Sequence, residues 1–126
     1  MVEPVVARSP PPLMTDPQSF VFDHERLDVY RAAVEAARRI RAARWPRRSA
    51  HIRDQAVRAS ESIVLNIAEG VGRGPGDARR NHHRIAFGSA AEARAALDVV
   101  DLPEEQMVPI DRLLRRIGAM LARMTR

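Results

Sequence analysis

The chain has 126 residues, enough for one domain with a single hydrophobic core, and it has no cysteine, which excludes disulfides, thiolate metal sites and cysteine nucleophiles. Aromatic residues make up only 4%, so aliphatic side chains must build the core, a composition that favours helices. The formal net charge is +5 and all 21 basic residues are arginine, whose guanidinium group binds phosphate in a bidentate manner.

Residues 1–21 contain five of the nine prolines and are predicted to be a disordered or polyproline-like tail. They lack the basic and long apolar regions of a signal peptide. No segment reaches the apolar length of a transmembrane helix. We therefore expect a cytoplasmic protein without a membrane partner, in which residues 22–126 form the folded domain.

A first amphipathic helix is predicted to begin at Asp23, as its N-cap, and to end at Trp45-Pro46. Its apolar stripe follows steps of three and four residues: Leu27, Tyr30, Val34, Ala37 and Ile40. A second helix is predicted over residues 49–70, capped by Ser49. The run Ser62-Ile63-Val64-Leu65 has the β-branching of a strand, but it lies within a long segment that shows no period-2 alternation, so we interpret it as helical.

Glycine then occupies every second position from Gly70 to Gly76. Such a segment can cradle a phosphate, or it can end one helix and begin another. A Walker loop needs a preceding strand and a lysine, and the chain has no lysine; the dinucleotide fingerprint lacks its third glycine. We interpret the segment as a helix–helix turn, in which Gly70 or Gly72 adopts the left-handed conformation, Pro75 stops the helix and Asp77 caps the next one.

A third helix is predicted over residues 77–100, with Ile85, Ser89, Glu92 or Ala93, Ala96 and Val99 recurring at helical spacing. Gly88 in its middle suggests close approach of another helix. The last helix either begins near Val108 or begins near Pro103 and kinks at Pro109. Four amphipathic helices with short connections predict an all-α fold, an antiparallel up-and-down four-helix bundle.

Candidates for catalysis are few. Asn66 and Glu69 share one face of the second helix, where we expect Asn66 to satisfy loop backbone groups and Glu69 to pair with an arginine of the facing helix such as Arg84; a ligand role is the alternative. Adjacent histidines at 82 and 83 point about 100° apart on a helix and do not predict a metal site. Ser89 has no nucleophile elbow around it. We predict no metal, no cofactor and no enzymatic activity; an enzyme using Glu69 or Glu92 is a further alternative.

The charge distribution is the most informative feature. Eight arginines and one acid, Asp54, lie between positions 38 and 58, with Trp45 as a stacking surface. In an up-and-down bundle this cluster lies at one end, and a smaller one lies near the other. The predicted phosphate contacts are Arg38, Arg41, Arg44, Arg47, Arg48, Arg53, Arg58 and, from the smaller cluster, Arg73. We predict a nucleic-acid partner, RNA or DNA with RNA favoured; the alternative is a scaffold or adaptor that binds an acidic protein.

The order DxxxRASESIxxNIAEGxGR, followed after a short loop by RIAFGSAAEA, closely resembles a bacterial four-helix-bundle family. Its members were first noted as products of intervening sequences in large-subunit ribosomal RNA genes, and it includes the accessory variability proteins of diversity-generating retroelements. The motif residues include Asn66, Glu69, Gly70, Gly72, Gly88, Ser89 and Glu92. The resemblance covers residues 22–124.

This resemblance implies an antiparallel bundle, often assembled as a ring-like homopentamer with a basic surface. In the retroelement relatives it implies binding of nucleic acid and of a reverse transcriptase, so an enzyme partner is also expected. The motif residues would mainly hold the bundle together. The chain departs from the family pattern at Val64, where proline is usual, and at His82 and His83, where apolar or aromatic residues are usual.

Overall fold

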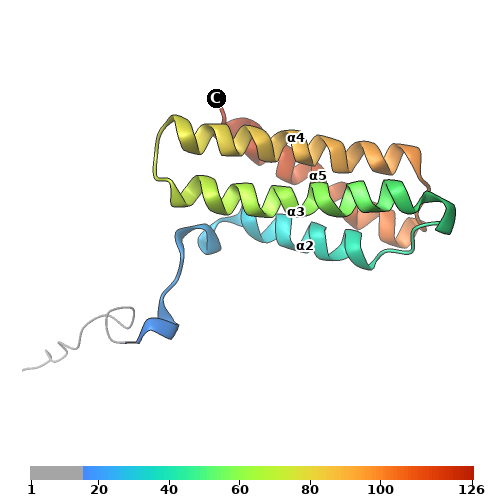
Figure 1. Cartoon of the computed structure of the whole chain (residues 1–126), viewed down its shortest axis with the longest axis horizontal. Helices are drawn as coiled ribbons and strands as arrows, with labels where there is room; N and C mark the ends of the chain where they lie inside the picture. Colours follow the sequence, from blue (N-terminus) through green and yellow to red (C-terminus); the bar gives the residue numbers. More distant parts are fainter. Residues whose placement is uncertain (1–15) are drawn as a thin grey trace, which may run out of the picture.

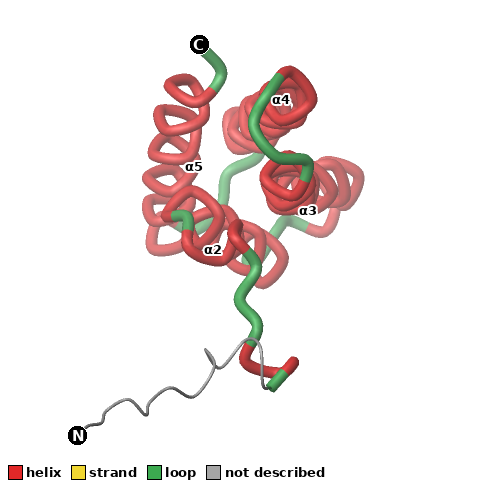
Figure 2. The backbone as a smooth tube through the Cα atoms, turned by 90° about the vertical axis from the view of Figure 1, so that its left-hand side faces the viewer, coloured by secondary structure: helices red, strands yellow, loops and turns green. Residues whose placement is uncertain are grey.

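The computed structural model describes residues 16–126 of the protein, and this range is helical with no strand. Each long helix contacts the next along the chain, and the last closes against the first (Figures 1 and 2). The predicted all-α four-helix bundle is confirmed. The four long helices are α2 (Asp28–Ala42), α3 (Ala50–Gly72), α4 (Asp77–Val99) and α5 (Glu104–Met124). Two short 3-10 helices precede α2, η1 (Pro17–Ser19) and η2 (Asp23–Arg26), and a third, η3 (Arg47–Ser49), lies between α2 and α3.

The N-terminal part of the chain departs from the sequence prediction. Asp23 does not cap a long helix; it begins η2, and α2 begins only at Asp28 because Leu27 is extended, with φ −88° and ψ 133°. The backbone N–H of Phe22 donates to the Glu25 carboxylate at 3.2 Å, which stabilises the short turn instead. Most of the predicted proline-rich tail, residues 1–15, lies outside the described residues, so that prediction stays open.

The core consists of aliphatic side chains from all four helices, as the composition predicts. Its largest fully buried aliphatic members are Ile40, Ile63, Ile67, Ile110, Ile117 and Leu121. On α4 the buried face only partly matches the predicted one: Ala93 and Ala96 are buried as predicted, but Ile85 and Val99 are 44% and 70% exposed, and His83, Ala86, Ala90 and Leu97 are buried instead. Because alanine occurs on every side of this helix, its apolar periodicity does not single out one face.

The glycine-rich segment is a helix–helix turn, as predicted, but different glycines carry it. Helix α3 continues through Gly72, and the left-handed region is occupied by Gly74, with φ +80°, and Gly76, with φ +134°. Gly76 takes the N-cap position of α4, which leaves Asp77 as the first helical residue rather than the cap. No phosphate-binding geometry is needed to explain this glycine spacing.

Helix α5 follows the longer of the two predicted alternatives, since it begins at Glu104 and contains Pro109. The backbone N–H groups of Gln106 and Met107 donate to the Pro103 carbonyl, each at 2.9 Å, and close the first turn. As a result the acidic start of α5, with Glu104 and Glu105, lies at the same end of the bundle as the α2–α3 connection (Figure 1). Within residues 16–126, no helix is long and apolar enough to cross a membrane.

Candidate nucleic-acid interface

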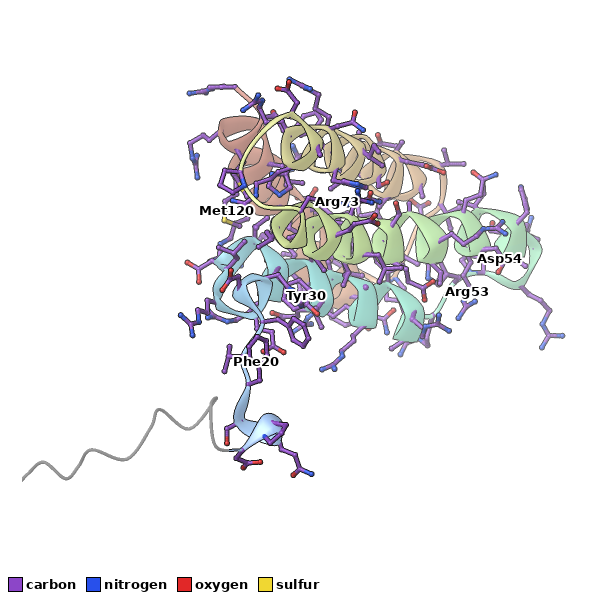
Figure 3. The ribbon with its side chains drawn as sticks, turned by 60° about the vertical axis from the view of Figure 1, so that its left-hand side comes forward. Phe20, Tyr30, Arg53, Asp54, Arg73 and Met120 are labelled. Atoms are coloured by element: carbon purple, nitrogen blue, oxygen red, sulfur yellow. The ribbon has the colours of Figure 1, made fainter. Side chains whose placement is uncertain are left out.

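The predicted arginine cluster lies at one end of the bundle, which we call the arginine end (residues 38–58). The last turns of α2, the connection that contains η3 and the first turns of α3 meet there (Figure 1). Arg53 and Asp54 mark this end in Figure 3, while Arg73 lies toward the other end of α3. The sequence therefore places the main cluster correctly along the bundle.

The connection at the arginine end is held in place by hydrogen bonds to α2 and to α5. The indole Nε1–H of Trp45 donates to the Ile40 carbonyl at 2.9 Å, and the backbone N–H of Arg44 donates to the Gln106 side chain at 2.8 Å. Trp45 is partly buried against the core. Its indole therefore secures the C-terminus of α2, so its predicted role as a stacking surface is not supported by this geometry. The arginines of the loop are presented from a fixed backbone.

Three of the predicted phosphate contacts at this end are engaged with carboxylates. Arg41 pairs with Glu61, Arg44 pairs with Glu105 at 3.0 Å, and Arg53 lies 3.7 Å from Asp54. Arg53 also donates to the Arg41 carbonyl at 3.1 Å. These exposed pairs contribute little stability, about 0–1 kcal/mol each, but they lower the net positive charge of the surface. Counting only Asp54 within the sequence window overestimates the local charge.

Four arginines of the arginine end have no such partner. Among residues 16–126, no side-chain hydrogen bond or ion pair involves Arg38, Arg47, Arg48 or Arg58, and all four are exposed. Arg47 and Arg48 belong to η3 at the tip of the bundle. Their guanidinium groups can accept an external anion without first breaking an internal contact. Arg47 and Arg48 are therefore the best-placed phosphate ligands of the predicted set.

Arg73 does not belong to the same surface. It is twenty residues beyond Arg53 on α3, a separation of about 30 Å along the helix axis (Figure 3). Its guanidinium pairs with Glu69 at 2.8 Å, one turn back on the same helix. Nearby, Arg79 donates to the Val71 carbonyl at 3.0 Å and so stabilises the end of α3. Arg73 and Arg79 thus make contacts within the protein, whereas Arg47 and Arg48 make no side-chain contact of this kind among residues 16–126.

The motif residues of α3 and α4 form a chain of polar contacts between these helices. Asn66 donates to the Ser62 carbonyl at 2.9 Å, and its Oδ1 lies 3.0 Å from Nδ1 of His82. The Ser89 hydroxyl donates to the Ser62 hydroxyl at 2.9 Å. The predicted partners were wrong: among residues 16–126, Asn66 bonds to no loop backbone, and Glu69 pairs with Arg73 and lies 3.6 Å from Nε2 of His82 rather than pairing with Arg84. The hydrogen bond from Arg73 lowers the pKa of the Glu69 carboxyl.

Among the motif glycines, Gly70 is the one at a close helix contact. A Cβ at Gly70 would lie 3.0 Å from His82 Cβ and 3.2 Å from the Arg79 carbonyl oxygen. Gly88, predicted to allow close approach, has no such neighbour within 4 Å in the described chain, and neither has Gly72. Glu92 is exposed on α4. The α3–α4 contact is therefore tightest near the turn, where His82 and His83 pack.

His83 is a buried titratable group, only 2% exposed, and its Nε2 has no hydrogen-bond partner among residues 16–126. Burial, with smaller contributions from the charges of Arg79 and His82, lowers the pKa of this imidazole. The neutral ring is thus the form that fits the core. Within the same range, no group of three or more His, Cys, Asp or Glu side chains is arranged to hold a metal ion.

We expect the free energy of unfolding to fall as the pH drops below about 6.5, the ordinary pKa of histidine. The unfolded chain then binds a proton at His83 that the folded chain does not, which costs up to about 1.4 kcal/mol per pH unit between the two pKa values. His83→Leu should flatten this dependence in urea unfolding between about pH 7.5 and about pH 5.5. The exposed His51→Leu should leave it unchanged. Equal pH dependence in His83→Leu and the wild type would contradict the assignment of this effect to His83. The pKa of the Glu69 carboxyl is lowered from its ordinary value, so Glu69 does not account for a dependence in this pH range.

The family model described as 23S rRNA-intervening sequence protein matches residues 25–123. The chain belongs to this family. No match was found among curated proteins.

In this member of the 23S rRNA-intervening sequence protein family, the match begins in η2 and ends in the last turn of α5, so it includes the whole bundle. The arginine end lies inside the matched range, and residues 16–24 precede that range.

Two features of the surface were missed from the sequence. Glu105 approaches Arg44 across the bundle, and the antiparallel order of the helices would have placed it there. Of the exposed aromatic residues before α2, Phe20 was assigned to the tail and Phe22 to the start of the folded domain, and neither was considered as a surface feature.

Proposed function

We propose that this protein is a non-enzymatic, homo-oligomeric accessory protein that binds nucleic acid, RNA in preference to DNA, by contacts to the phosphate backbone. The observation that carries the proposal is the pair Arg47 and Arg48, exposed at the tip of the bundle and without a partner among residues 16–126. Membership of a family named for ribosomal RNA intervening sequences agrees with an RNA-related role.

The contact chemistry follows from the guanidinium group. Each arginine can donate two parallel hydrogen bonds to one phosphate, and each contact releases a condensed counterion. The loop that carries Arg47 and Arg48 is fixed by Trp45 and by the Arg44–Gln106 hydrogen bond, so little backbone ordering is required on binding. No base-reading element is needed, since backbone contacts carry no sequence information directly. The proposed binding is therefore tolerant of sequence.

A non-enzymatic role is favoured by the contacts of the polar side chains. The Ser89 hydroxyl donates to Ser62 rather than to a base, and Glu69 is held by Arg73. Among residues 16–126, neither forms a nucleophile–base pair with an orienting third group, the arrangement that triad-type acyl transfer uses. The contacts of these residues instead join α3 to α4.

Titration of fluorescent single- and double-stranded RNA and DNA with the full-length protein tests the proposal. The logarithm of the binding constant should fall linearly with the logarithm of salt concentration, with a slope of about −0.7 to −0.9 per phosphate contact. Absence of binding to all four ligands at low salt would refute it. Binding of an acidic polypeptide with greater affinity than RNA would instead support the scaffold or adaptor alternative, in which the same arginines meet carboxylates of a protein partner.

A further inference from the structure

The bundle carries an open apolar groove between α2 and α3. Its volume is about 340 Å³, and its apolar lining consists of Val34, Ala37, Val64 and Leu65. The side chain of Leu65 is 66% exposed, although it lies in the middle of a long helix. An apolar surface of this kind commonly marks a contact with another molecule.

The rim of the groove is charged. Arg41 and Glu61, on opposite sides, pair with each other, whereas Arg38 has no ion pair among residues 16–126. The groove therefore offers an apolar floor beside one uncompensated guanidinium. A fitting occupant would carry apolar side chains flanked by carboxylates.

A segment with these properties precedes α2. We call residues 16–26 the arm. Phe20 and Phe22 are 50% and 58% exposed, and their rings contact each other edge to face with centroids 5.2 Å apart. Three carboxylates and one arginine flank them: Asp16, Asp23, Glu25 and Arg26. The first part of the arm leads away from the bundle (Figures 1 and 2). Phe20 and Phe22 line a pocket with residues of the α3–α4 turn, among them Val71 and Pro75, but half or more of each residue stays exposed.

We propose that the arm of one copy of this chain occupies the α2–α3 groove of a second copy. The two phenylalanines contact the apolar floor around Leu65, and the arm carboxylates lie near Arg38. Each copy presents one arm and one groove, so the contact is head-to-tail, and it closes into a ring when the rotation between neighbours permits. The inference rests on the homo-oligomeric part of the proposed function and names the surfaces that would form it.

This arrangement gives different roles to Arg38 and to the pair Arg47 and Arg48. Arg38 belongs to the contact between copies. Arg47 and Arg48 are in η3 at the bundle tip, beyond the groove-lining residues of α2, and stay accessible to phosphate. A ring would then display several copies of the pair Arg47 and Arg48. One polyanion that binds several of these pairs at once is bound with higher overall affinity.

Mixing of two full-length variants provides the test, by light scattering without nucleic acid. The groove variant is Leu65→Arg; the arm variant carries Phe20→Ser and Phe22→Ser. Because all three side chains are at least half exposed, the fold should be retained, and circular dichroism checks this. The wild type should be oligomeric at micromolar concentration and each variant monomeric. Val99→Arg, on the exposed face of α4, controls for an added charge and should keep the wild-type mass.

The mixture of the two variants discriminates most sharply. The groove variant retains its arm and the arm variant retains its groove, so equal amounts should form a heterodimer and nothing larger. A monomeric wild type, an arm variant with the wild-type mass, or a mixture that stays monomeric would each overturn the proposal. Nucleic-acid binding is measured separately by titration. Loss of binding with an intact oligomer would refute the phosphate-binding function and leave the arm contact standing.

Discussion

Replacing both Arg47 and Arg48 with glutamine is expected to weaken RNA binding by about 100-fold near 0.1 M salt, because each phosphate contact contributes roughly tenfold there through counterion release. The salt slope should become shallower by about 1 for each arginine removed. Fold and assembly should be unaffected, since both side chains are exposed and neither bonds to another of residues 16–126. Fluorescence anisotropy at several salt concentrations measures both quantities.

The matched control is Arg112→Gln with Arg116→Gln. These two arginines of α5 are also exposed and have no ion pair within residues 16–126, so the substitution removes the same charge from a different surface. It should reduce affinity much less than the change at the tip. A second comparison, Arg41→Gln with Arg44→Gln, removes arginines that already pair with Glu61 and Glu105. Equal losses in all three variants would show that net charge alone governs binding.

Much of the fold was predictable because its signals are local. Proline and glycine mark the ends of helices, as Pro46, Gly74 and Gly76 do here, and apolar spacing of three and four residues identifies the long helices. The choice between helix and strand for residues 62–65 depended on the length of the surrounding segment and on its lack of period-2 alternation. These signals require no knowledge of which helices are neighbours.

Apart from local errors at the helix ends, such as the caps predicted at Asp23 and Asp77, the incorrect predictions concern contacts between elements. A carboxylate sixty-one residues away in sequence pairs with Arg44, and local charge counting does not include it. Likewise, close packing was predicted at Gly88, whereas the close helix contact lies at Gly70, where α4 approaches the end of α3. The candidate nucleic-acid interface also depends on contacts between elements that are distant in sequence. The sequence identified the arginine cluster, whereas the fold determined which of its members are free.

The buried polar residues are a further example. His82 and His83 are adjacent in sequence, but their environments differ: His82 contacts Asn66 and Glu69 at the helix boundary, and His83 points into the core. Helical geometry predicts that the two side chains diverge. It does not predict which one is buried, because the apolar face of α4 is ambiguous in an alanine-rich sequence.

Gly70→Val is expected to lower the free energy of unfolding by about 1–3 kcal/mol, the usual cost of overpacking. A Cβ at this position would lie 3.0 Å from His82 Cβ, 3.2 Å from the Arg79 carbonyl oxygen and 3.2 Å from His83 Cδ2. The first two neighbours are at or next to the backbone and cannot rotate away, so α3 and α4 must separate near the turn. Urea unfolding of purified protein measures the effect.

Gly88→Val is the matched control. It introduces the same side chain in the middle of a helix, but no atom outside the helix backbone lies within 4 Å of the new Cβ in the described chain. Valine is a better helix former than glycine by a few tenths of a kcal/mol, so this variant should be as stable as the wild type or slightly more stable. Equal destabilisation by the two substitutions would indicate close helix packing at Gly88 as well, the position at which the sequence predicted it. Destabilisation confined to Gly70→Val would place the tight helix contact beside the α3–α4 turn, where His83 is buried.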